Sequence, residues 1–326
     1  MKLLVVGLGS MGKRRIRLIL SLAAGHELAG VDTSEERRDA ATELFGIPCW
    51  GDLQKAISEF MPEAVLICTS PISHGPIALA CLAKGLHVFT EINLLSDWYD
   101  EAMDLAEKHG VMLFVSSTFL YRKETMFIAD MAQQHPRSNY IYHCGQYLPD
   151  WHPWESYKSF FVANKKTNGC REIFAIELPW IFKAFGKVTS YHAIKNKTSS
   201  LDIDYPDNYL VMLEHESGSK GIFCVDVLSR KPVRSLELFS EDIHLFWEGT
   251  PDSLSIFDIE KKQELPVSLY EVVEHQEGYA VTIIENAYLE EMKNFLGCIQ
   301  GGAEPKHSLS ADREVLELID RIEAGI

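Results

Sequence analysis

One short segment near the N-terminus constrains the fold of this chain more than any other. The apolar run Leu3–Val6 leads directly into the sequence Gly7-Leu8-Gly9-Ser10-Met11-Gly12, and residues with helical apolar spacing follow. In such a G-x-G-x-x-G pattern the glycines permit a tight turn, close approach of the backbone to a pyrophosphate, and close packing of the helix. The start of the helix also attracts phosphate charge. The segment predicts a dinucleotide-binding unit, in which Ser10 and Met11 lie beside the cofactor with the three glycines.

A carboxylate at the expected distance supports this interpretation. Asp32 ends the next predicted strand, where it can accept hydrogen bonds from both ribose hydroxyls of the adenosine half. It would repel a 2'-phosphate, so NAD is favoured over NADP. Binding of NADP remains an alternative because of Arg37 and Arg38, since a basic pair can neutralise the 2'-phosphate. The alternative is that both arginines lie on the solvated face of the following helix.

Alternating strands and helices predict the fold class of the first part of the chain. Up to about Thr118, short apolar strands alternate with amphipathic helices, which is typical of a parallel, doubly wound sheet and hence of an N-terminal Rossmann domain. A capping box is expected at Thr33 and Glu36. The predicted strands are Lys2–Val6, Glu27–Asp32, Ala64–Cys68, His87–Thr90 and Val111–Val115, and the predicted helices span 11–22, 35–45, 53–59, 77–84 and 99–109.

Beyond Tyr121 the pattern changes to a helix and then to longer strands with alternating polarity. This favours a C-terminal α+β domain with a predominantly antiparallel, open sheet. We therefore predict an NAD(P)-binding domain over residues 1–118 and a substrate-binding and oligomerisation domain over 119–326. Predicted elements of the second domain are the strands Tyr140–Leu148, Tyr209–Glu214 and Gly221–Leu228 and the helices Arg171–Phe185, Val281–Gln300 and Ala311–Ala324.

Composition excludes several classes of partner. The 326 residues carry a formal net charge of -16, which opposes binding to nucleic acid. No apolar run approaches the ~20 residues that span a bilayer, and Leu3–Val6 is too short for a signal-peptide core. We therefore expect a cytoplasmic protein without a membrane partner. The seven cysteines are scattered and show no Cys/His metal spacing, so buried reduced thiols and no metal are expected.

A second group of small polar residues follows the predicted strand Ala64–Cys68. The sequence Thr69-Ser70-Pro71-Ile72-Ser73-His74 begins a helix at the carboxyl edge of the sheet, where ligands bind. The segment therefore places small polar groups and free backbone N–H groups where a ligand would bind. The alternative is that Ser73 only caps the helix and that His74 is a surface histidine.

These residues resemble a known family. The motif GLGSMG, followed by CTSPISHGPIALACLAKGLHVFTEINL, is similar to the glucose-fructose oxidoreductase, inositol dehydrogenase and MocA family, and the resemblance extends over essentially the whole chain. It implies a Rossmann domain, a C-terminal open-sheet domain, and oxidation or reduction of sugars, polyols or nucleotide-linked sugars with NAD(P). It further implies that the adenosine half binds Gly7, Gly9, Gly12 and Asp32 and that the rest of the cofactor lies along Thr69, Ser70, Pro71, His74 and Glu91.

The chain departs from this family at its catalytic positions. Where the family usually has Glu-Lys-Pro, this chain has Glu91-Ile92-Asn93, and Ile92 cannot transfer a proton. The family's second element is a helix with aspartate and histidine, but the residues after Gly169 read CREIFAIELPW. Loss of both elements argues against the family's usual lysine and histidine chemistry.

A glutamate in the latter helix is the first candidate for a replacement acid/base. Hydride transfer from a carbinol carbon requires a group that removes the hydroxyl proton. Glu177 lies in an apolar stretch, where burial would raise its pKa. Glu172 points ~140° away from it around the helix, so the two do not face one pocket. The alternative for Glu177 is a structural carboxylate in a salt bridge, with Arg171 as a candidate partner.

An aromatic loop at Gln146–Glu155 gives the second candidate, His152. Aromatic faces beside hydrogen-bonding groups suit sugar rings. We expect Trp151, Trp154 and Tyr157 to line the substrate, with Tyr121 at the predicted domain junction. The alternative is a proline-braced loop that packs its own aromatic rings.

Two charged segments remain open to more than one interpretation. Lys165 and Lys166 would hold a substrate phosphate or carboxylate, or else form a solvated turn. The run Asp202–Asn208 is acidic but lacks the spacing of a calcium loop, which favours a loop that enters a strand.

The sequence thus predicts an NAD-dependent oxidoreductase with non-standard catalytic residues. Its expected substrate is a sugar, polyol or nucleotide-sugar derivative, and its expected assembly is a homo-dimer or homo-tetramer. The alternative is a non-enzymatic dinucleotide-binding regulatory or sensor protein that kept the nucleotide site. The sequence leaves open the substrate's identity and the direction of hydride transfer.

Overall fold

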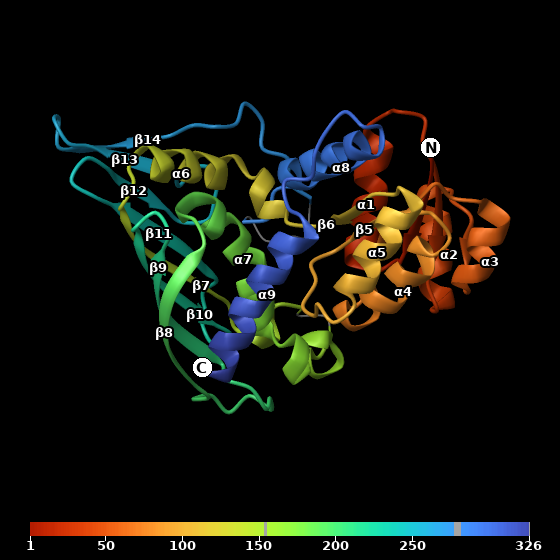
Figure 1. The fold of residues 1–326 in the computed structure, drawn as a ribbon, viewed down its shortest axis with the longest axis horizontal. Coiled ribbons are helices and arrows are strands. Elements are labelled where there is room, and N and C mark those ends of the chain that lie inside the picture. The colour runs from red at the N-terminus through yellow and green to blue at the C-terminus, as the bar shows by residue number, and fades with distance from the viewer. Residues whose placement is uncertain (153–154, 277–281, 326) are drawn as a thin grey trace. The chain divides into compact units, whose positions relative to one another are not determined.

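The computed structural model describes residues 1–152, 155–276 and 282–325. The chain divides into two compact units. The first comprises Met1–Thr118 and Tyr288–Leu316, and the second comprises Phe119–Ala287 and Glu317–Ile326. Each unit contains its own sheet (Figure 1). Assignment of cofactor binding to residues 1–118 and of substrate binding to 119–326 stays a prediction.

The first unit contains a six-stranded sheet in the order β3-β2-β1-β4-β5-β6, and all its strand pairs are parallel. Leu3, Leu4 and Val5 are fully buried, as is the whole of β4, which is what a sheet covered on both faces requires. The predicted Rossmann fold is confirmed. The strands are β1 (Lys2–Val6), β2 (Glu27–Val31), β3 (Cys49–Trp50), β4 (Ala64–Ile67), β5 (His87–Thr90) and β6 (Leu113–Val115).

Seven helices of the described chain contribute residues to this unit. The cap of α2 differs from the expected capping box, because Ser34 rather than Thr33 accepts a hydrogen bond, from the Arg37 backbone N–H. Glycines end α2 and α5 in the left-handed conformation, at Gly46 and Gly110, where a residue without a Cβ atom is favoured. The helices are α1 (Ser10–Ser21), α2 (Glu35–Phe45), α3 (Leu53–Phe60), α4 (His74–Leu82), α5 (Tyr99–His109), α8 (Glu285–Ile299) and α9 (Leu309–Ala324).

The second unit contains an eight-stranded sheet in the order β14-β13-β12-β11-β7-β10-β9-β8. Only the described pair β7 and β10 is parallel, so the predicted, mostly antiparallel sheet is confirmed. The helices α6 (Lys123–Gln134) and α7 (Gly169–Phe185) accompany it. The strands are β7 (Asn139–Gly145), β8 (Val188–Asn196), β9 (Asn208–His215), β10 (Lys220–Asp226), β11 (Val233–Phe239), β12 (His244–Trp247), β13 (Ser255–Asp258) and β14 (Gln263–Pro266).

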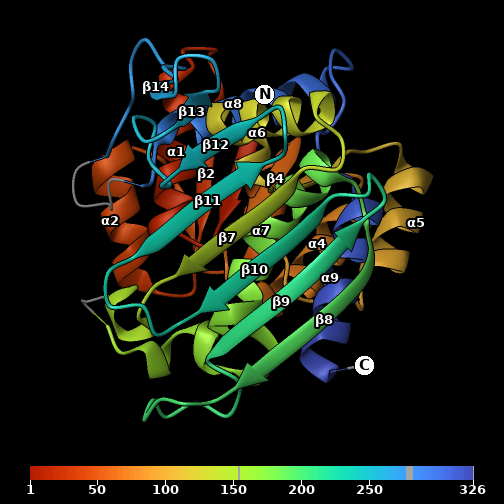
Figure 2. The ribbon, with the colours of Figure 1, turned by 90° about the vertical axis from the view of Figure 1, so that its left-hand side faces the viewer.

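The two faces of this second sheet differ. On the inner face, the buried rings of Tyr142 and Phe223 stack on each other, and Tyr142 meets Trp180 of α7 edge to face. Tyr140 lies across Gly221 on the neighbouring strand, where a Cβ atom would be 1.9 Å from the Tyr140 Cζ. The outer face is seen in Figure 2, and no described helix lies in front of it.

The buried side of α7 carries a glutamate that pairs with an arginine and ties the helix to the sheet. Glu177 is fully buried. Its Oε1 accepts hydrogen bonds from Arg234 Nε and Nη2 at 3.1 and 2.8 Å, and its Oε2 accepts from the Tyr142 hydroxyl and the Trp180 indole, both at 2.7 Å. These donors satisfy both oxygens of the buried carboxylate and tie α7 to β7 and β11.

A second glutamate on the same helix has a buried carboxyl oxygen without a hydrogen-bond donor in the described part of the chain. Glu172 Oε2 is buried and has no hydrogen-bond partner among the described residues. Burial raises the pKa of Glu172 to about 8, because its charge has no compensating donor or cation. Glu172 is therefore protonated at neutral pH.

The same substitution at these two glutamates is expected to change stability in opposite directions. Glu177→Gln leaves Arg234 without its counter-charge and should cost about 3–5 kcal/mol of the unfolding free energy. Glu172→Gln removes a carboxyl group whose pKa is higher in the folded protein than in the unfolded chain. Wild-type stability should therefore fall as pH rises from the ordinary value of 4.5 to about 8, whereas this variant should lack that fall.

Thermal and urea unfolding of the wild type and both variants between pH 5 and 9 measures this. Equal effects of the two substitutions at pH 8 would contradict the different surroundings assigned to the two carboxyl groups.

Candidate functional site

The glycine motif forms a turn with room for a ligand at only one of its three glycines. Gly7 follows β1 with a φ of +93°, and a Cβ there would lie 2.7 Å from the Cys68 carbonyl oxygen. A Cβ on Gly12 would lie 1.9 Å from the Gly7 carbonyl oxygen. By contrast, a Cβ on Gly9 would meet only the end of Arg37, at 3.9 Å. The backbone is therefore accessible at Gly9, directly before the first residue of α1, where a pyrophosphate is expected.

Asp32 is held beside this turn by backbone donors. It follows β2, and its side chain is almost completely buried. Its Oδ2 accepts a hydrogen bond from the Leu8 backbone N–H at 2.8 Å, and its Oδ1 accepts one from the Ser34 N–H at 2.9 Å. The carboxylate is thus fixed next to the glycine turn, and each oxygen has lone pairs left for a ribose hydroxyl.

The two arginines of α2 have different surroundings. Arg37 Nη1 lies 3.7 Å from Asp32 Oδ2, and this side chain is 58% exposed. Arg38 Nη1 instead donates to the backbone carbonyl oxygens of Asp32 and Thr33, at 2.8 and 3.0 Å. Arg38 therefore stabilises the turn after β2, and Arg37 is the basic side chain at the ribose position.

The loops after β4 and β5 are joined by a buried histidine. His74 is fully buried, which differs from the surface position considered above. Its Nδ1 lies 2.7 Å from the Asn93 Oδ1, and its Nε2 lies 3.0 Å from the Thr69 carbonyl oxygen. The Ser73 hydroxyl donates to Thr69 Oγ1 and to the Ser70 carbonyl oxygen. His74 thus fixes the positions of Thr69 and Asn93 at the carboxyl edge of the sheet, and Ser70 and Pro71 lie in the same loop.

A buried arginine fixes Glu91, the predicted cofactor residue after β5. Arg15 of α1 is fully buried and donates from Nε and Nη2 to the two carboxylate oxygens of Glu91, at 2.6 and 3.0 Å. Its Nη2 also lies 2.8 Å from an oxygen of Glu291 in α8. Sequence analysis missed both Arg15 and Glu291, because their charges are typical of solvated helix faces and their positions lie far apart along the chain.

Glu291 continues this cluster to the end of β6. It accepts hydrogen bonds from the Ser117 backbone N–H at 2.7 Å and from the Ser116 and Thr118 hydroxyls. Burial raises the pKa of Glu291, an effect that Arg15 opposes. Polar groups after β1, β2, β4, β5 and β6 therefore all lie at one edge of the sheet. The edge between β1 and β4 is where strand order reverses, and ligands of such sheets bind there.

In the second unit, the structure places His152 in a pair that is open to solvent. His152 Nδ1 lies 2.7 Å from Glu155 Oε1, and the two side chains are 28% and 39% exposed. The Trp151 indole donates to the Gln146 carbonyl oxygen at 3.0 Å. The Tyr157 hydroxyl accepts from the Asp202 backbone N–H at 3.1 Å. Trp154 lies outside the described residues.

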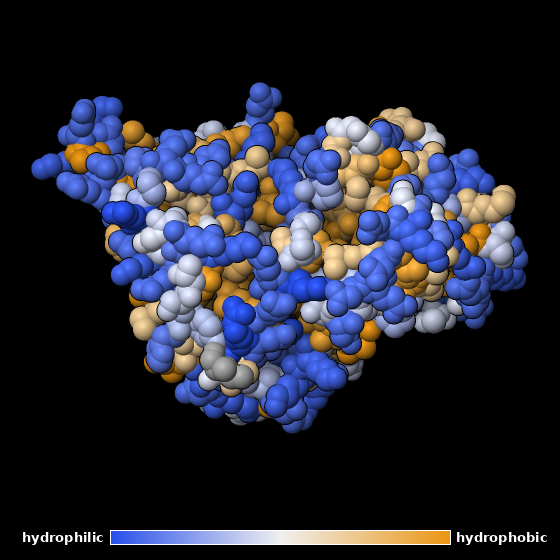
Figure 3. All heavy atoms as spheres, in the orientation of Figure 1, coloured by the Kyte–Doolittle hydropathy of each residue, from blue (hydrophilic) through white to orange (hydrophobic). Residues whose placement is uncertain are grey.

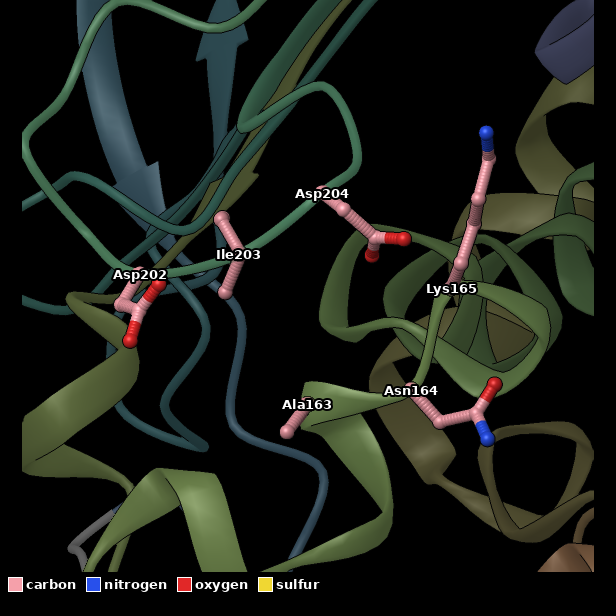
Figure 4. Close-up of a pocket in the computed structure, with 6 residues that line it drawn as sticks. All are labelled: Ala163, Asn164, Lys165, Asp202, Ile203 and Asp204. Atoms are coloured by element: carbon pink, nitrogen blue, oxygen red, sulfur yellow. The ribbon is translucent and has the colours of Figure 1, made fainter.

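A polar pocket of about 460 Å³ lies next to this segment. Residues 163–165 form one side of it and residues 202–204 the other, and its charged side chains are Lys165, Asp202 and Asp204 (Figure 4). Asp202 pairs with Lys158, so the acidic run is partly neutralised by the loop opposite. Tyr121 is buried, although the sequence placed it among the substrate contacts.

Glu177, the first acid/base candidate, has the environment of the structural alternative. Its partner is Arg234, whereas Arg171 pairs with Asp320 and Glu323. The donors around Glu177, which include the Cys144 thiol, come from buried or half-buried side chains. Its role in catalysis was predicted from the apolar surroundings alone, which do not reveal hydrogen-bonding partners from β7 and β11.

Two curated relatives share part or most of the chain. Myo-inositol 2-dehydrogenase of Thermotoga maritima is 22% identical over 330 residues, which covers 94% of this chain and 90% of that protein. The 4-carboxy-2-hydroxymuconate-6-semialdehyde dehydrogenase of a Sphingobium species is 24% identical over 131 residues. The latter match covers 39% of this chain and 42% of that protein.

Solved structures share the fold over essentially the whole chain. The UDP-N-acetylglucosamine 3-dehydrogenase of Acidithiobacillus ferrooxidans superposes with a TM-score of 0.77 at 15% identity, covering 100% of this chain and 97% of that one. Levoglucosan dehydrogenase in complex with NADH superposes with a TM-score of 0.80 at 15% identity, covering 99% and 96%. Among the described residues, no helix is both long and apolar enough to cross a bilayer.

Residues 1–117 match the family described as "Oxidoreductase family, NAD-binding Rossmann fold". This agrees with the glycine turn, the fixed Asp32 and the strand order of the first sheet. Over these residues the chain therefore matches the glucose-fructose oxidoreductase, inositol dehydrogenase and MocA family of oxidoreductases.

Proposed function

We propose that this protein is an NAD-dependent oxidoreductase that acts on a sugar, polyol or nucleotide-sugar derivative. The observation that carries the proposal is Asp32, which backbone donors fix at the end of β2 beside the accessible Gly9. Relatives named as an inositol dehydrogenase and a UDP-N-acetylglucosamine dehydrogenase support the substrate class. Seven free cysteines fit a reducing compartment such as the cytoplasm.

The residues of the first unit fit a dinucleotide. The N-terminus of α1 and the Gly9 backbone would hold the pyrophosphate, and Asp32 would accept the adenosine ribose hydroxyls. Thr69, Ser70, Pro71, His74 and Glu91 would lie along the remainder. When bound, the nicotinamide supplies the hydride acceptor or donor. The chain's own task is then to orient the substrate hydroxyl and to take up or return its proton.

Exchange of Asp32 should change cofactor preference. Asp32→Ala should weaken NAD binding by about 10- to 100-fold, since it removes charged hydrogen bonds worth about 1.5–3 kcal/mol. It should also strengthen NADP binding, because Arg37 remains at the ribose position without a repelling carboxylate. Calorimetric titration with NAD, NADH, NADP and NADPH measures both effects.

Arg37→Ala provides the matched control for this experiment. Alone it should leave NAD affinity nearly unchanged, and combined with Asp32→Ala it should abolish the gain for NADP. Unchanged NAD affinity in Asp32→Ala would contradict the proposed site.

We further propose His152 as the group that exchanges the substrate proton. Unlike Glu177, His152 is reachable from solvent, and Glu155 lies at hydrogen-bonding distance from its ring and can orient it. A Glu–His pair of this kind accepts a proton without prior loss of buried hydrogen bonds. Trp151 and Tyr157 would line the substrate, and Lys165 offers a cation for an anionic substituent.

Loss of His152 should reduce turnover without loss of cofactor affinity. In an absorbance assay of NADH against sugars, polyols and nucleotide sugars, His152→Gln should lower kcat by about 10²- to 10⁴-fold. Glu155→Gln should give a smaller decrease, since it removes only the orienting partner. Wild-type turnover in His152→Gln would disprove this role, and NAD binding without turnover on any substrate would favour a sensor protein.

The outer face of the second sheet is proposed to bind a second copy of the chain. Five apolar side chains between 44% and 59% exposed lie on it in neighbouring strand positions, namely Ile141, Ile194, Leu210, Met212 and Ile222. The face shown in Figure 3 is, by comparison, largely hydrophilic. A flat apolar face can oppose its own copy across a two-fold axis, which buries both faces at once.

A charge in this apolar face should prevent self-association. Light scattering during size exclusion should give a multiple of 36.9 kDa for the wild type and a single-chain mass for Met212→Glu. Ile259→Glu is the control, because Ile259 is similarly exposed but follows β13 in a turn. A monomeric wild type, or equal masses for the two variants, would refute the interface.

A further inference from the structure

We propose that His143, Cys224 and Asp226 form a binding site for a zinc-type transition-metal ion on the outer face of the second sheet. His143 of β7 and Cys224 of β10 lie directly opposite each other, and Asp226 follows two residues later on the same face. The ligand atoms of the three side chains all lie within 4.8 Å of one another.

The carboxylate of this group is built into place by its neighbours. Asp226 lies opposite Gly145, where a Cβ atom would be only 2.3 Å from Asp226 Oδ2. The missing side chain allows the carboxylate to lie across β7 and to reach His143 Nε2, at 2.6 Å. Only a glycine at this position leaves that space.

Backbone donors orient the carboxylate from its other side. Oδ1 of Asp226 accepts hydrogen bonds from the N–H groups of Leu228 and Ser229, both at 2.7 Å, and Oδ2 accepts one from the Ser229 hydroxyl at 2.9 Å. Such outer contacts fix a metal-binding carboxylate and are a regular feature of metal sites. Within the single chain the Asp226 side chain is 8% exposed and His143 is 37% exposed, so the carboxylate anchors the site in the sheet.

The donor set selects the class of metal. One imidazole nitrogen, one thiolate and one carboxylate oxygen suit Zn²⁺, whereas Mg²⁺ and Ca²⁺ prefer oxygen ligands alone. In a tetrahedral zinc site, sulfur and nitrogen ligands are about 3.6 Å apart, so a movement of about 1 Å closes the group. The metal would replace the proton between His143 Nε2 and Asp226 Oδ2, the thiol proton would pass to the buffer, and water would fill the fourth position.

Cobalt provides a direct probe of the thiolate ligand. After removal of metals with a chelator and desalting, one equivalent of Co²⁺ should give the wild type a thiolate-to-metal charge-transfer band, and added Zn²⁺ should abolish it. Cys224→Ser should lose the band. His143→Gln should bind Co²⁺ and Zn²⁺ at least about tenfold more weakly in calorimetry.

Cys49→Ser and His192→Gln are the matched controls. Cys49 is another half-buried free cysteine, and His192 is another histidine in the second sheet, so both variants should bind as the wild type does. The proposal is overturned if the wild type gives no charge-transfer band, or if the band persists in Cys224→Ser. Circular dichroism of each variant shows that it is folded, and cofactor affinity, measured separately, is expected to stay unchanged.

Discussion

The first unit depends on one buried guanidinium. Arg15 joins α1, the segment after β5 and α8, because it lies between Glu91 and Glu291 with no exposed surface of its own. Buried charges are tolerated only with matching partners, and removal of one partner leaves an uncompensated charge. The edge of the sheet that receives the dinucleotide is therefore fixed by electrostatics as well as by apolar packing.

The second unit also depends on a buried charged group, but here the central group is acidic and its charged partner is basic. The buried Glu177 carboxylate accepts hydrogen bonds from Arg234, Tyr142 and Trp180 and so connects α7 with the sheet. A group that is surrounded by donors in this way stabilises a fold, but it is poorly suited to exchange protons with a substrate. For this reason, access to solvent is a better guide to a proton-exchanging group than an apolar sequence context.

Local patterns in the sequence predicted much of the fold but little of the electrostatics. The glycine turn, Asp32 and the strands of the first sheet are encoded by neighbouring residues, so their pattern is visible in the sequence. By contrast, β8 has no fully buried residue and β14 is exposed throughout, so neither shows the apolar run that marks a strand. Contacts such as those of Arg15 with Glu291, or of His143 with Cys224, join residues more than 80 positions apart. The periodicity of apolar residues along the sequence cannot predict such long-range contacts.

The two glycines that admit larger neighbours also define how β7 and β10 align. Gly221 accommodates the Tyr140 ring on the inner face, and Gly145 accommodates the Asp226 carboxylate on the outer face. A slip of two residues would place Tyr140 opposite a residue with a side chain, and Asp226 would lose the gap it occupies. The register of the parallel pair β7 and β10 is thus fixed by one glycine on each face of the sheet. A shifted register would produce steric clashes on the inner face and displace the carboxylate on the outer face.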